Sequence, residues 1–370
     1  MEELLKQAYK SRRILVTGDT GFKGSWLSQW LLLLDAEVYG VGLEPNTNPA
    51  LYTQLRLGQH IDHRTLDIND YQALEKCIQD IRPDIIFHLA AQSLVRESYK
   101  TPLETMQVNV MGTAHVLEAV RSLKLPTAVV AITSDKCYEN KEWLFGYREG
   151  DPMGGYDPYS ASKGAAELVI SSWRRSFFSP EHISSHGVRI ASARAGNVIG
   201  GGDWAVDRIV PDAVRFLQQG KVIQVRNPHA TRPWQHVLEP LGGYLLLGSK
   251  LLLAGDHSAA YCEGFNFGPN VSSNKPVSVL ADEIVKNWGS GSWTYKQENA
   301  AHEASLLHLS ADKAYHVLGW QPAWNFNQTV SRTVEWYKAT NDDPSQVLPL
   351  TQRQINVYMN DFNLVPSLHY

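Results

Sequence analysis

The feature that most constrains the fold is a glycine-rich turn between a short apolar strand and a helix near the start of the chain. The apolar run at 13–17 is followed by Gly18-Asp-Thr-Gly21-Phe-Lys-Gly24, and apolar residues then recur with helical spacing over 25–34. Glycines here let the backbone approach a pyrophosphate, whose charge meets the helix N-terminus. An ordinary tight turn is the alternative for the glycines alone. We predict a dinucleotide cradle that uses Gly18, Gly21, Phe22, Lys23 and Gly24.

Strand and helix patterns alternate beyond this turn. Further strands are predicted at 37–41, 65–68, 84–90, 128–132 and 189–194, and helices at 71–81, 109–123 and 159–178. This alternation is typical of a doubly wound parallel α/β sheet of the Rossmann type. We expect an NAD-binding domain at 1–198 and a smaller, interleaved substrate-binding lobe at 199–370, with segments near 235–270 returning to the first domain. The aromatic-rich tail from 287 to 370 should pack onto the substrate loops.

Composition excludes several classes of protein. The 370 residues include 34 basic and 38 acidic ones without a long basic run, which argues against a nucleic-acid partner. Three cysteines without CxxC spacing fit a reduced cytoplasm and predict neither a disulfide framework nor a metal site. The N-terminus does not resemble a signal peptide, and the apolar stretch 244–254 is too short to span a bilayer. We therefore expect a cytoplasmic protein without a membrane partner.

Two acidic residues follow the predicted second and third strands. Glu44 lies twenty residues after Gly24 and can accept from an adenosine ribose, although a solvated loop carboxylate is the alternative. Asp67 is either an adenine contact or the N-cap of the helix at 71–81. No arginine between 42 and 50 is present to hold a 2′-phosphate, which favours NAD as the cofactor. Further predicted cofactor contacts are Ile68, Leu89, Ala90 and Ala91.

Polar residues after the fourth strand and in the later loops are candidate substrate contacts. Gln92, Ser93 and Arg96 are the first polar groups after a run of small residues, whereas His88 within the strand is predicted to be a core histidine. The loops beyond Gly196 carry indoles, amides and cations, which suit a nucleotide with a diphosphate. From these loops we predict contacts by Asn197, Arg208, Arg232 and His236.

The centre of the predicted site is the end of the strand at 128–132. This continuously apolar run stops at Thr133-Ser-Asp-Lys136, and ligands of open α/β sheets bind beyond the carboxyl ends of strands. Tyr159 and Lys163 are spaced to share one helical face. A free phenol titrates near pH ~10, so Lys163 would be needed to favour the phenolate as a base for alcohol oxidation.

These motifs resemble a known family. The glycine turn, the Tyr159-x-x-x-Lys163 spacing and Leu318-Gly-Trp-Gln-Pro322 resemble extended short-chain dehydrogenases that act on nucleotide sugars. Thr133-Ser-Asp-Lys136, Arg194-Ala-Gly-Asn-Val-Ile-Gly-Gly-Gly-Asp203 and Thr231-Arg-Pro-Trp-Gln-His236 are similar, in particular, to the CDP-glucose 4,6-dehydratase family, nearly end to end. The related dTDP-glucose enzymes have Thr-Asp-Glu at the strand end, where this chain has Ser134, Asp135 and Lys136.

The resemblance implies an internal redox cycle on CDP-glucose. Tyr159, Lys163 and Ser134 would oxidise the carbon-4 hydroxyl with NAD⁺, Asp135 would be the acid that expels the carbon-6 hydroxyl, and hydride would return to carbon 6. Lys136 would be either the carbon-5 base or a support for the enolate. The resemblance also implies a place in 3,6-dideoxyhexose synthesis for surface polysaccharide such as lipopolysaccharide O-antigen.

Other functions and the assembly state remain open at this point. The alternatives are another nucleotide-sugar 4,6-dehydratase, a 4-epimerase, or a catalytically silent NAD-binding sensor or scaffold, against which the intact Tyr159 and Lys163 pair argues. Helices predicted at 105–123 and 159–178 carry apolar residues on more than one face. We therefore expect a homodimer or a dimer of dimers.

Overall fold

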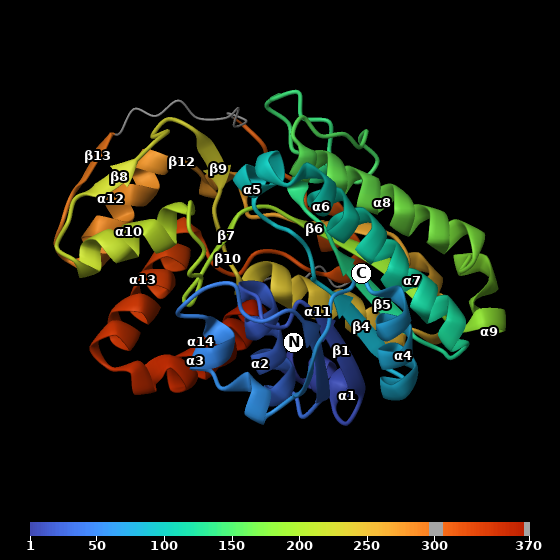
Figure 1. Cartoon of the computed structure of the whole chain (residues 1–370). Coiled ribbons are helices and arrows are strands. Elements are labelled where there is room, and N and C mark those ends of the chain that lie inside the picture. Colours follow the sequence, from blue (N-terminus) through green and yellow to red (C-terminus); the bar gives the residue numbers. More distant parts are fainter. Residues whose placement is uncertain (296–305, 366–370) are drawn as a thin grey trace.

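The computed structural model describes residues 1–295 and 306–365, and its centre is a seven-stranded sheet in which every pairing is parallel (Figure 1). The spatial order is β11-β6-β5-β4-β1-β2-β3. The strands are β1 (Arg13–Thr17), β2 (Glu37–Gly42), β3 (Asp62–Thr65), β4 (Ile85–His88), β5 (Ala128–Ile132), β6 (Arg189–Ala195) and β11 (Gly264–Phe267). The strand order reverses beside β1, between β2 and β4, so a ligand crevice is expected at that point. The doubly wound parallel sheet is confirmed.

Helices cover both faces of the sheet because its strands are apolar on both sides. Ile14 and Val16 of β1 pack into one core with helices α1 (Glu2–Tyr9), α2 (Phe22–Leu33) and α11 (Leu238–Leu253). Leu15, which lies between them, packs into a second core on the opposite face. That face is covered by α4 (Tyr71–Ile81), α7 (Gly112–Leu123) and α8 (Pro158–Ser176).

A smaller group of elements lies beside the carboxyl ends of the strands, on the left of Figure 1. Its paired strands are β7 with β10, β9 with β12, and β8 with β13. Their bounds, with those of the accompanying helices, are β7 (Val198–Ile199), α10 (Ile209–Gln218), β8 (Ile223–Val225), β9 (Thr231–Pro233), β10 (Gln235–His236), β12 (Asn274–Pro276), α12 (Val277–Trp288), β13 (Trp293–Tyr295) and α13 (Phe326–Asp342). Between β10 and β12 the chain returns to the sheet through α11 and β11. The domain division at residue 198 stays a prediction.

The last helix, α14 (Val347–Leu364), departs from our expectation for the tail. The preceding α13 packs on α12 and β10 of the smaller group, but α14 contacts α2, which covers the sheet. The rings of Trp30 and Tyr358 meet edge to face with centroids 5.6 Å apart. The expectation that the tail packs onto the substrate loops is therefore wrong for α14. Residues 296–305 and 366–370 of the tail lie outside the residues that the structure describes.

Several strands and helices also begin or end at residues other than the predicted ones. The third strand ends at Thr65, so Asp67 lies in the loop that follows it. The helix expected over 105–123 falls in three consecutive elements, in which a π-helical turn lies between two α-helical segments. The remaining short elements are α3 (Leu51–Gln54), η1 (Leu57–Gln59), α5 (Val95–Lys100), α6 (Pro102–Met106), η2 (Gln107–Met111), η3 (Asp135–Cys137), η4 (Pro180–His182), α9 (Ile183–His186), η5 (Gly255–Tyr261), η6 (Val271–Ser273), η7 (Ala314–Leu318) and η8 (Pro344–Gln346). No helix in the described ranges is long and apolar enough to cross a membrane.

Candidate active site

A large cavity lies between the carboxyl ends of the strands and the smaller group of elements. Its volume is about 1710 Å³, well above the roughly 300–1,000 Å³ of a drug-sized pocket. Its walls come from the glycine turn, the ends of β2, β4 and β5, the start of α8 and the loops after β6. The cavity therefore has room for more than one nucleotide-sized ligand.

The glycine turn forms one end of this cavity. Gly18 has φ +75°, and a Cβ atom there would lie 2.8 Å from the backbone nitrogen of Ala90. A Cβ atom at Gly24 would lie 2.1 Å from the carbonyl oxygen of Gly18. Only glycine permits both approaches, and together they open the N-terminus of α2 toward the cavity. All five predicted turn residues line the cavity, Gly18, Gly21, Phe22, Lys23 and Gly24.

Lys23 contributes a cation beside this turn. The pKa of its amine is lowered to about 8, chiefly by burial and also by nearby Arg208, while Asp135 opposes the shift. Its Nζ donates to the hydroxyl of Tyr244 at 3.5 Å. An ammonium in this position adds to the positive potential that the helix N-terminus offers to phosphates.

The acidic residues after β2 and β3 both reach the cavity. Glu44 is exposed on its rim and accepts a hydrogen bond from the Thr65 hydroxyl at 3.2 Å. Asp67 lines the cavity and accepts from the backbone of Asn69 at 2.9 Å. The alternative that Asp67 caps the helix at 71–81 is wrong, because Asp70 is the N-cap of α4 and accepts from the Ala73 nitrogen at 3.0 Å.

Asp19, inside the glycine turn, was missed by the sequence interpretation. It is fully buried and pairs with His63 Nδ1 at 2.7 Å. Burial raises the pKa of its carboxyl, while His63 lowers it. The partner lies on β3, distant in sequence, and no local pattern indicates the contact.

The loop after β4 is stabilised by hydrogen bonds of its own residue Gln92. Gln92 Nε2 donates to the Leu94 carbonyl at 3.1 Å and to the Thr105 hydroxyl at 2.9 Å, and its Oε1 accepts from the Leu94 nitrogen. Gln92 lines the cavity, but its amide already holds the loop in shape. The other predicted residues of this loop also line the cavity, namely Leu89, Ala90, Ala91, Ser93 and Arg96, together with Ile68 from the loop after β3.

His88 is a core residue, as predicted. Its ring nitrogens lie 2.7 Å from the Thr17 hydroxyl and 3.1 Å from the Thr113 hydroxyl. Burial lowers its pKa to about 3, so the ring is neutral near pH 7.

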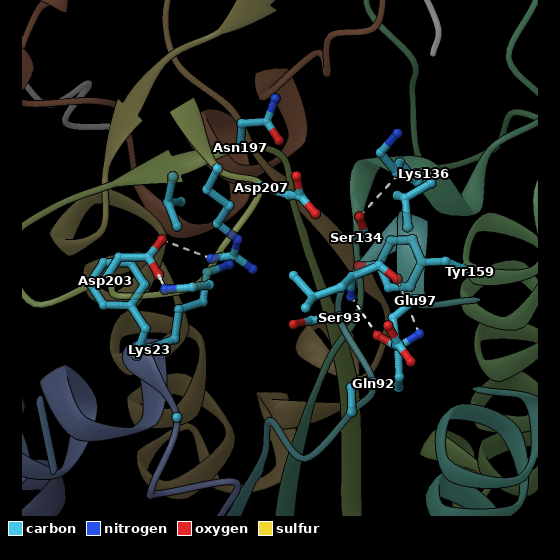
Figure 2. Close-up of a pocket in the computed structure, with 18 of the residues that line it drawn as sticks. Lys23, Gln92, Ser93, Glu97, Ser134, Lys136, Tyr159, Asn197, Asp203 and Asp207 are labelled. Atoms are coloured by element: carbon cyan, nitrogen blue, oxygen red, sulfur yellow. Dashed lines mark hydrogen bonds and ion pairs between the residues drawn. The ribbon is translucent and has the colours of Figure 1, made fainter. Parts of the chain in front are cut away.

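The strand-end cluster lies opposite the glycine turn. Figure 2 shows Ser134, Lys136 and Tyr159 on one side of the cavity and Lys23 with Asp203 on the other. Ser134 donates from its hydroxyl to Asp135 Oδ1 at 3.0 Å, and its side chain lowers the pKa of the nearby Tyr159 phenol. Asp135 is buried, whereas Lys136 is half-buried. The structure brings together all five predicted catalytic residues on the cavity wall, Ser134, Asp135, Lys136, Tyr159 and Lys163.

The start of α8 sets the position of Tyr159. Asp157 is the N-cap and accepts from the Ser160 nitrogen at 2.9 Å, and Pro158 occupies the first helical position. The Tyr159 nitrogen donates to the Ser98 hydroxyl at 3.1 Å, which ties this turn to α5.

Burial controls the charge of the two helix residues. It raises the pKa of the Tyr159 phenol to about 12, and the hydrogen bond from Ser134 opposes the shift. Burial lowers the pKa of the Lys163 amine to about 8, and the Glu167 carboxylate opposes that shift. Lys163 is therefore charged near pH 7 but loses its proton in the mildly alkaline range.

Cations from the smaller group of elements complete the wall. Arg208 pairs with Asp203 at 2.9 Å, and that carboxylate raises the pKa of the guanidinium. Arg232 donates to the Thr231 carbonyl at 2.9 Å. Arg208, Arg232 and Asn197 all line the cavity.

Asp207 is a second residue that the sequence interpretation missed. Its Oδ1 lies 3.1 Å from Arg96 Nη1 and 2.8 Å from Arg226 Nη1, and all three residues line the cavity. The contact joins α5 to the loop before α10, which are far apart in the chain.

His236 is not at the cavity, so its prediction as a substrate contact is wrong. It is fully buried in β10, which pairs with β7, and its ring packs edge to face on Trp26 and Trp324 at 6.0 and 4.9 Å. Burial lowers its pKa to about 3. It is a core histidine.

The sheet, the glycine turn and the Ser134, Tyr159 and Lys163 cluster define the class as a short-chain dehydrogenase-like α/β enzyme. Residues 15–333 match the family model described as GDP-mannose 4,6 dehydratase. The chain belongs to that family.

Relatives agree with this assignment, and solved structures share the fold. The chain is 48% identical to the CDP-glucose 4,6-dehydratase of Salmonella typhimurium, over 96% of this chain and 98% of that protein. It is 26% identical to a probable dTDP-glucose 4,6-dehydratase of Sinorhizobium fredii, over 88% and 92% of the two chains. A dTDP-glucose 4,6-dehydratase structure from Bacillus anthracis in complex with NAD has a TM-score of 0.74 at 21% identity, over 90% and 98%. A UDP-glucose 4-epimerase structure from Thermotoga maritima has a TM-score of 0.73 at 20% identity, over 89% and 99%. The two structures establish the shared fold.

Proposed function

We propose that this enzyme is an NAD-dependent hydro-lyase that converts CDP-D-glucose to CDP-4-dehydro-6-deoxy-D-glucose. The observation that carries the proposal is 48% identity, across nearly the whole of both chains, to a CDP-glucose 4,6-dehydratase. The catalytic residues that differ from the dTDP-glucose pattern, Ser134 and Lys136, lie on the wall of one cavity with Tyr159 and Lys163. The pairing of an acid with an amine at this strand end favours dehydration over 4-epimerisation.

The residues present fit a bound NAD. The Gly18 and Gly24 positions leave a cradle that a Cβ atom would fill, and Lys23 lies beside it. Glu44, Asp67 and Ile68 would surround the adenosine, and Leu89, Ala90 and Ala91 would lie along the dinucleotide. When bound, the nicotinamide accepts and returns the hydride of the reaction. No arginine occurs between 42 and 50, and the exposed Glu44 carboxylate would repel a 2′-phosphate.

In the proposed mechanism, Tyr159 removes the proton of the carbon-4 hydroxyl. Burial leaves the phenol a weak acid, with a pKa of about 12, so a nearby positive charge is required to stabilise the phenolate. The positive charge of Lys163 stabilises the phenolate, and the single Ser134 hydroxyl proton is left for the sugar oxygen when substrate binds. Ser134 also orients the sugar hydroxyl toward the phenolate.

Asp135 and Lys136 then carry out the loss of water. A ketone at carbon 4 acidifies the hydrogen at carbon 5, and Asp135 protonates the departing carbon-6 hydroxyl. Lys136 either takes the carbon-5 proton as a neutral amine or supports the enolate as an ammonium. Both roles require its amine at carbon 5.

The diphosphate of the substrate would be held from the opposite wall. Arg208 and Arg232 line the cavity with Asn197, and Gln92, Ser93 and Arg96 approach from the loop after β4. A guanidinium offers paired N–H donors to phosphate oxygens, and two guanidinium groups match a diphosphate. We place the NAD-binding domain at 1–198 and the nucleotide-sugar lobe mainly at 199–370.

We further propose a cytoplasmic homodimer or dimer of dimers that serves dideoxyhexose synthesis for surface polysaccharide. Apolar side chains are exposed along the outer helices, with Leu103 at 84%, Leu168 at 63% and Met111 at 47%. Pairing of α8 and of the helical run formed by α6, η2 and α7 with a second copy would cover them.

The function is tested by product analysis. Purified enzyme with NAD⁺ is incubated separately with CDP-, dTDP-, GDP- and UDP-linked sugars, and products are identified by NMR. We expect a 4-dehydro-6-deoxy product from CDP-glucose at the highest rate. A CDP-galactose product would instead establish a 4-epimerase, and no product from any sugar would favour a silent NAD-binding protein.

A further inference from the structure

Glu167 is a buried carboxylate outside the group of residues that the proposed mechanism uses. It lies on α8 four residues after Lys163, so the two side chains share one helical face. Its side chain is 3% exposed, and it does not line the cavity. A charge so enclosed requires partners.

Those partners come from two neighbouring strands. The Thr133 hydroxyl at the end of β5 donates to Glu167 Oε1 at 2.5 Å. From β6, the Ser192 hydroxyl and Arg194 Nη2 each lie 2.8 Å from Oε2. Thr133 directly precedes Ser134. The Glu167 carboxylate therefore connects the end of β5, which leads into Ser134, Asp135 and Lys136, to α8, which carries Tyr159 and Lys163.

The network continues into the loop that forms the outer wall of the cavity. Arg194 Nη1 donates to the Tyr138 hydroxyl at 2.7 Å and to the Glu149 carbonyl at 3.1 Å. The Tyr138 hydroxyl donates in turn to Asn266 Oδ1 at 2.8 Å. Tyr138 lines the cavity, so the Glu167 and Arg194 pair is connected both to the catalytic strand end and to the substrate wall.

We infer that Glu167 is a positioning residue for the reaction, one that fixes Thr133 and Ser134 against α8 and keeps a negative charge one helical turn from Lys163. The inference rests on the proposed function, because it assigns Glu167 a purpose in the oxidation that Tyr159 and Lys163 perform.

The charges around the pair support this role. Burial would raise the pKa of Glu167, but Arg194 and the hydrogen bonds from Thr133 and Ser192 lower it, so the carboxylate stays ionised. Its charge opposes the effect of burial on the Lys163 amine. The other titratable groups near Lys163 or Glu167 are Lys23 of α2, His88 of β4, Cys137 of η3 and Arg174 of α8.

The first test is Glu167→Gln, which keeps the shape but removes the charge. Lys163 is active as the ammonium, and without Glu167 it should lose its proton at lower pH. We expect the alkaline limb of kcat/KM for CDP-glucose to move down by about one pH unit, with roughly fivefold lower activity at pH 8. The titration of Lys163 can also be followed by NMR of ¹³Cε-labelled lysine, with its signal assigned from the Lys163→Met variant. In Glu167→Gln the midpoint of this titration should also move to lower pH.

Glu239→Gln is the matched control. Glu239 is also fully buried and accepts from the Ala323 and Trp324 nitrogens and the Tyr358 hydroxyl, but it does not line the cavity. Both variants should melt earlier, and only Glu167→Gln should change the pH profile. Equal melting losses with unchanged alkaline limbs in both would overturn the inference. The NMR titration needs no sugar, so it separates this inference from the substrate assignment, which fails only if wild-type enzyme does not convert CDP-glucose.

If Glu167→Gln does not fold, Thr133→Val tests the positioning role instead, because this change leaves the ion pair between Arg194 and Glu167 in place. Loss of the hydroxyl contact should lower kcat about tenfold with little change in KM, and Thr133→Ser should restore it. A normal kcat in Thr133→Val would overturn the positioning role.

Discussion

Gly196 lies directly against the carboxylate of Asp135, so that a Cβ atom at position 196 would be 2.5 Å from Oδ2. The loop after β6 thus leaves space for the proposed acid of the dehydration step. Gly196→Ala should displace Asp135 and slow water loss about tenfold or more, with the fold intact. Gly150→Ala is the control, since nothing lies within 4 Å of a Cβ atom there. Steady-state rates with CDP-glucose measure both variants, and a normal rate for Gly196→Ala would show that Asp135 tolerates displacement.

Tyr159→Phe should block the first step. The change removes the base with little change in volume, and general-base catalysis contributes roughly 10²–10⁴-fold. No reduced cofactor should form on mixing with CDP-glucose, and turnover should fall accordingly. Tyr295→Phe, at an exposed position on β13, serves as the control. Near-normal turnover by the Tyr159 variant would remove Tyr159 from the role of base.

Asp135→Asn should separate oxidation from dehydration. The amide keeps the geometry near Ser134 but cannot protonate the departing hydroxyl, so oxidation proceeds and water loss is slowed. Enzyme-bound NADH should then accumulate, and its absorbance after mixing with CDP-glucose measures it. If the variant fails to oxidise the sugar at all, Asp135 serves binding or the first step.

Lys136→Met should stall at the same stage for a different reason. The side chain keeps similar length but loses the amine that acts at carbon 5. Exchange of solvent deuterium into carbon 5 should fall together with product formation, while bound NADH builds up. Normal exchange at carbon 5 would assign proton removal to another group.

The activity of the wild-type enzyme should decline above pH ~8. The pKa of Lys163 is lowered from its ordinary value to about 8, so the active ammonium is present below that pH and is lost as pH rises through it. A kcat/KM profile for CDP-glucose measures the limb. A plateau that extends beyond pH ~10 would mean that the charge of Lys163 is not required.

Leu168→Glu should weaken assembly. Leu168 is 63% exposed on α8, and a carboxylate there would be buried unpaired in the proposed dimer. Sedimentation at micromolar concentration should change from a dimer or larger species to the 41.4 kDa monomer. Leu364→Glu, 81% exposed at the end of α14, should leave assembly unchanged. A wild-type protein that sediments only as monomer would contradict the proposal itself.

The local motifs were predictable from the sequence because strand, glycine turn and helix are adjacent in the chain. The parallel sheet and the placement of Ser134, Tyr159 and Lys163 on one cavity wall follow from that order. His236 was misassigned because its neighbours Arg232 and Trp234 are typical of a ligand loop, whereas its burial depends on β7 and on two distant tryptophans. The local sequence around a residue does not indicate contacts with such distant partners.

The same limit applies to the charged contacts across the cavity. Asp207 joins Arg96 and Arg226 from three separate segments, and Asp19 meets His63 from β3. Neither spacing nor periodicity in the chain indicates these pairs. Asp67 was ambiguous for a local reason, because Asp70 offers the same capping chemistry three residues later.

Transfer of a label within the sugar tests the central claim most directly. CDP-glucose carrying deuterium at carbon 4 is incubated with enzyme and unlabelled NAD⁺, and the product is examined by NMR. Internal oxidation, dehydration and return of hydride predict deuterium in the carbon-6 methyl group of the 4-dehydro-6-deoxy sugar. Deuterium retained at carbon 4 of a hexose epimer, or lost to the free cofactor, would contradict the account.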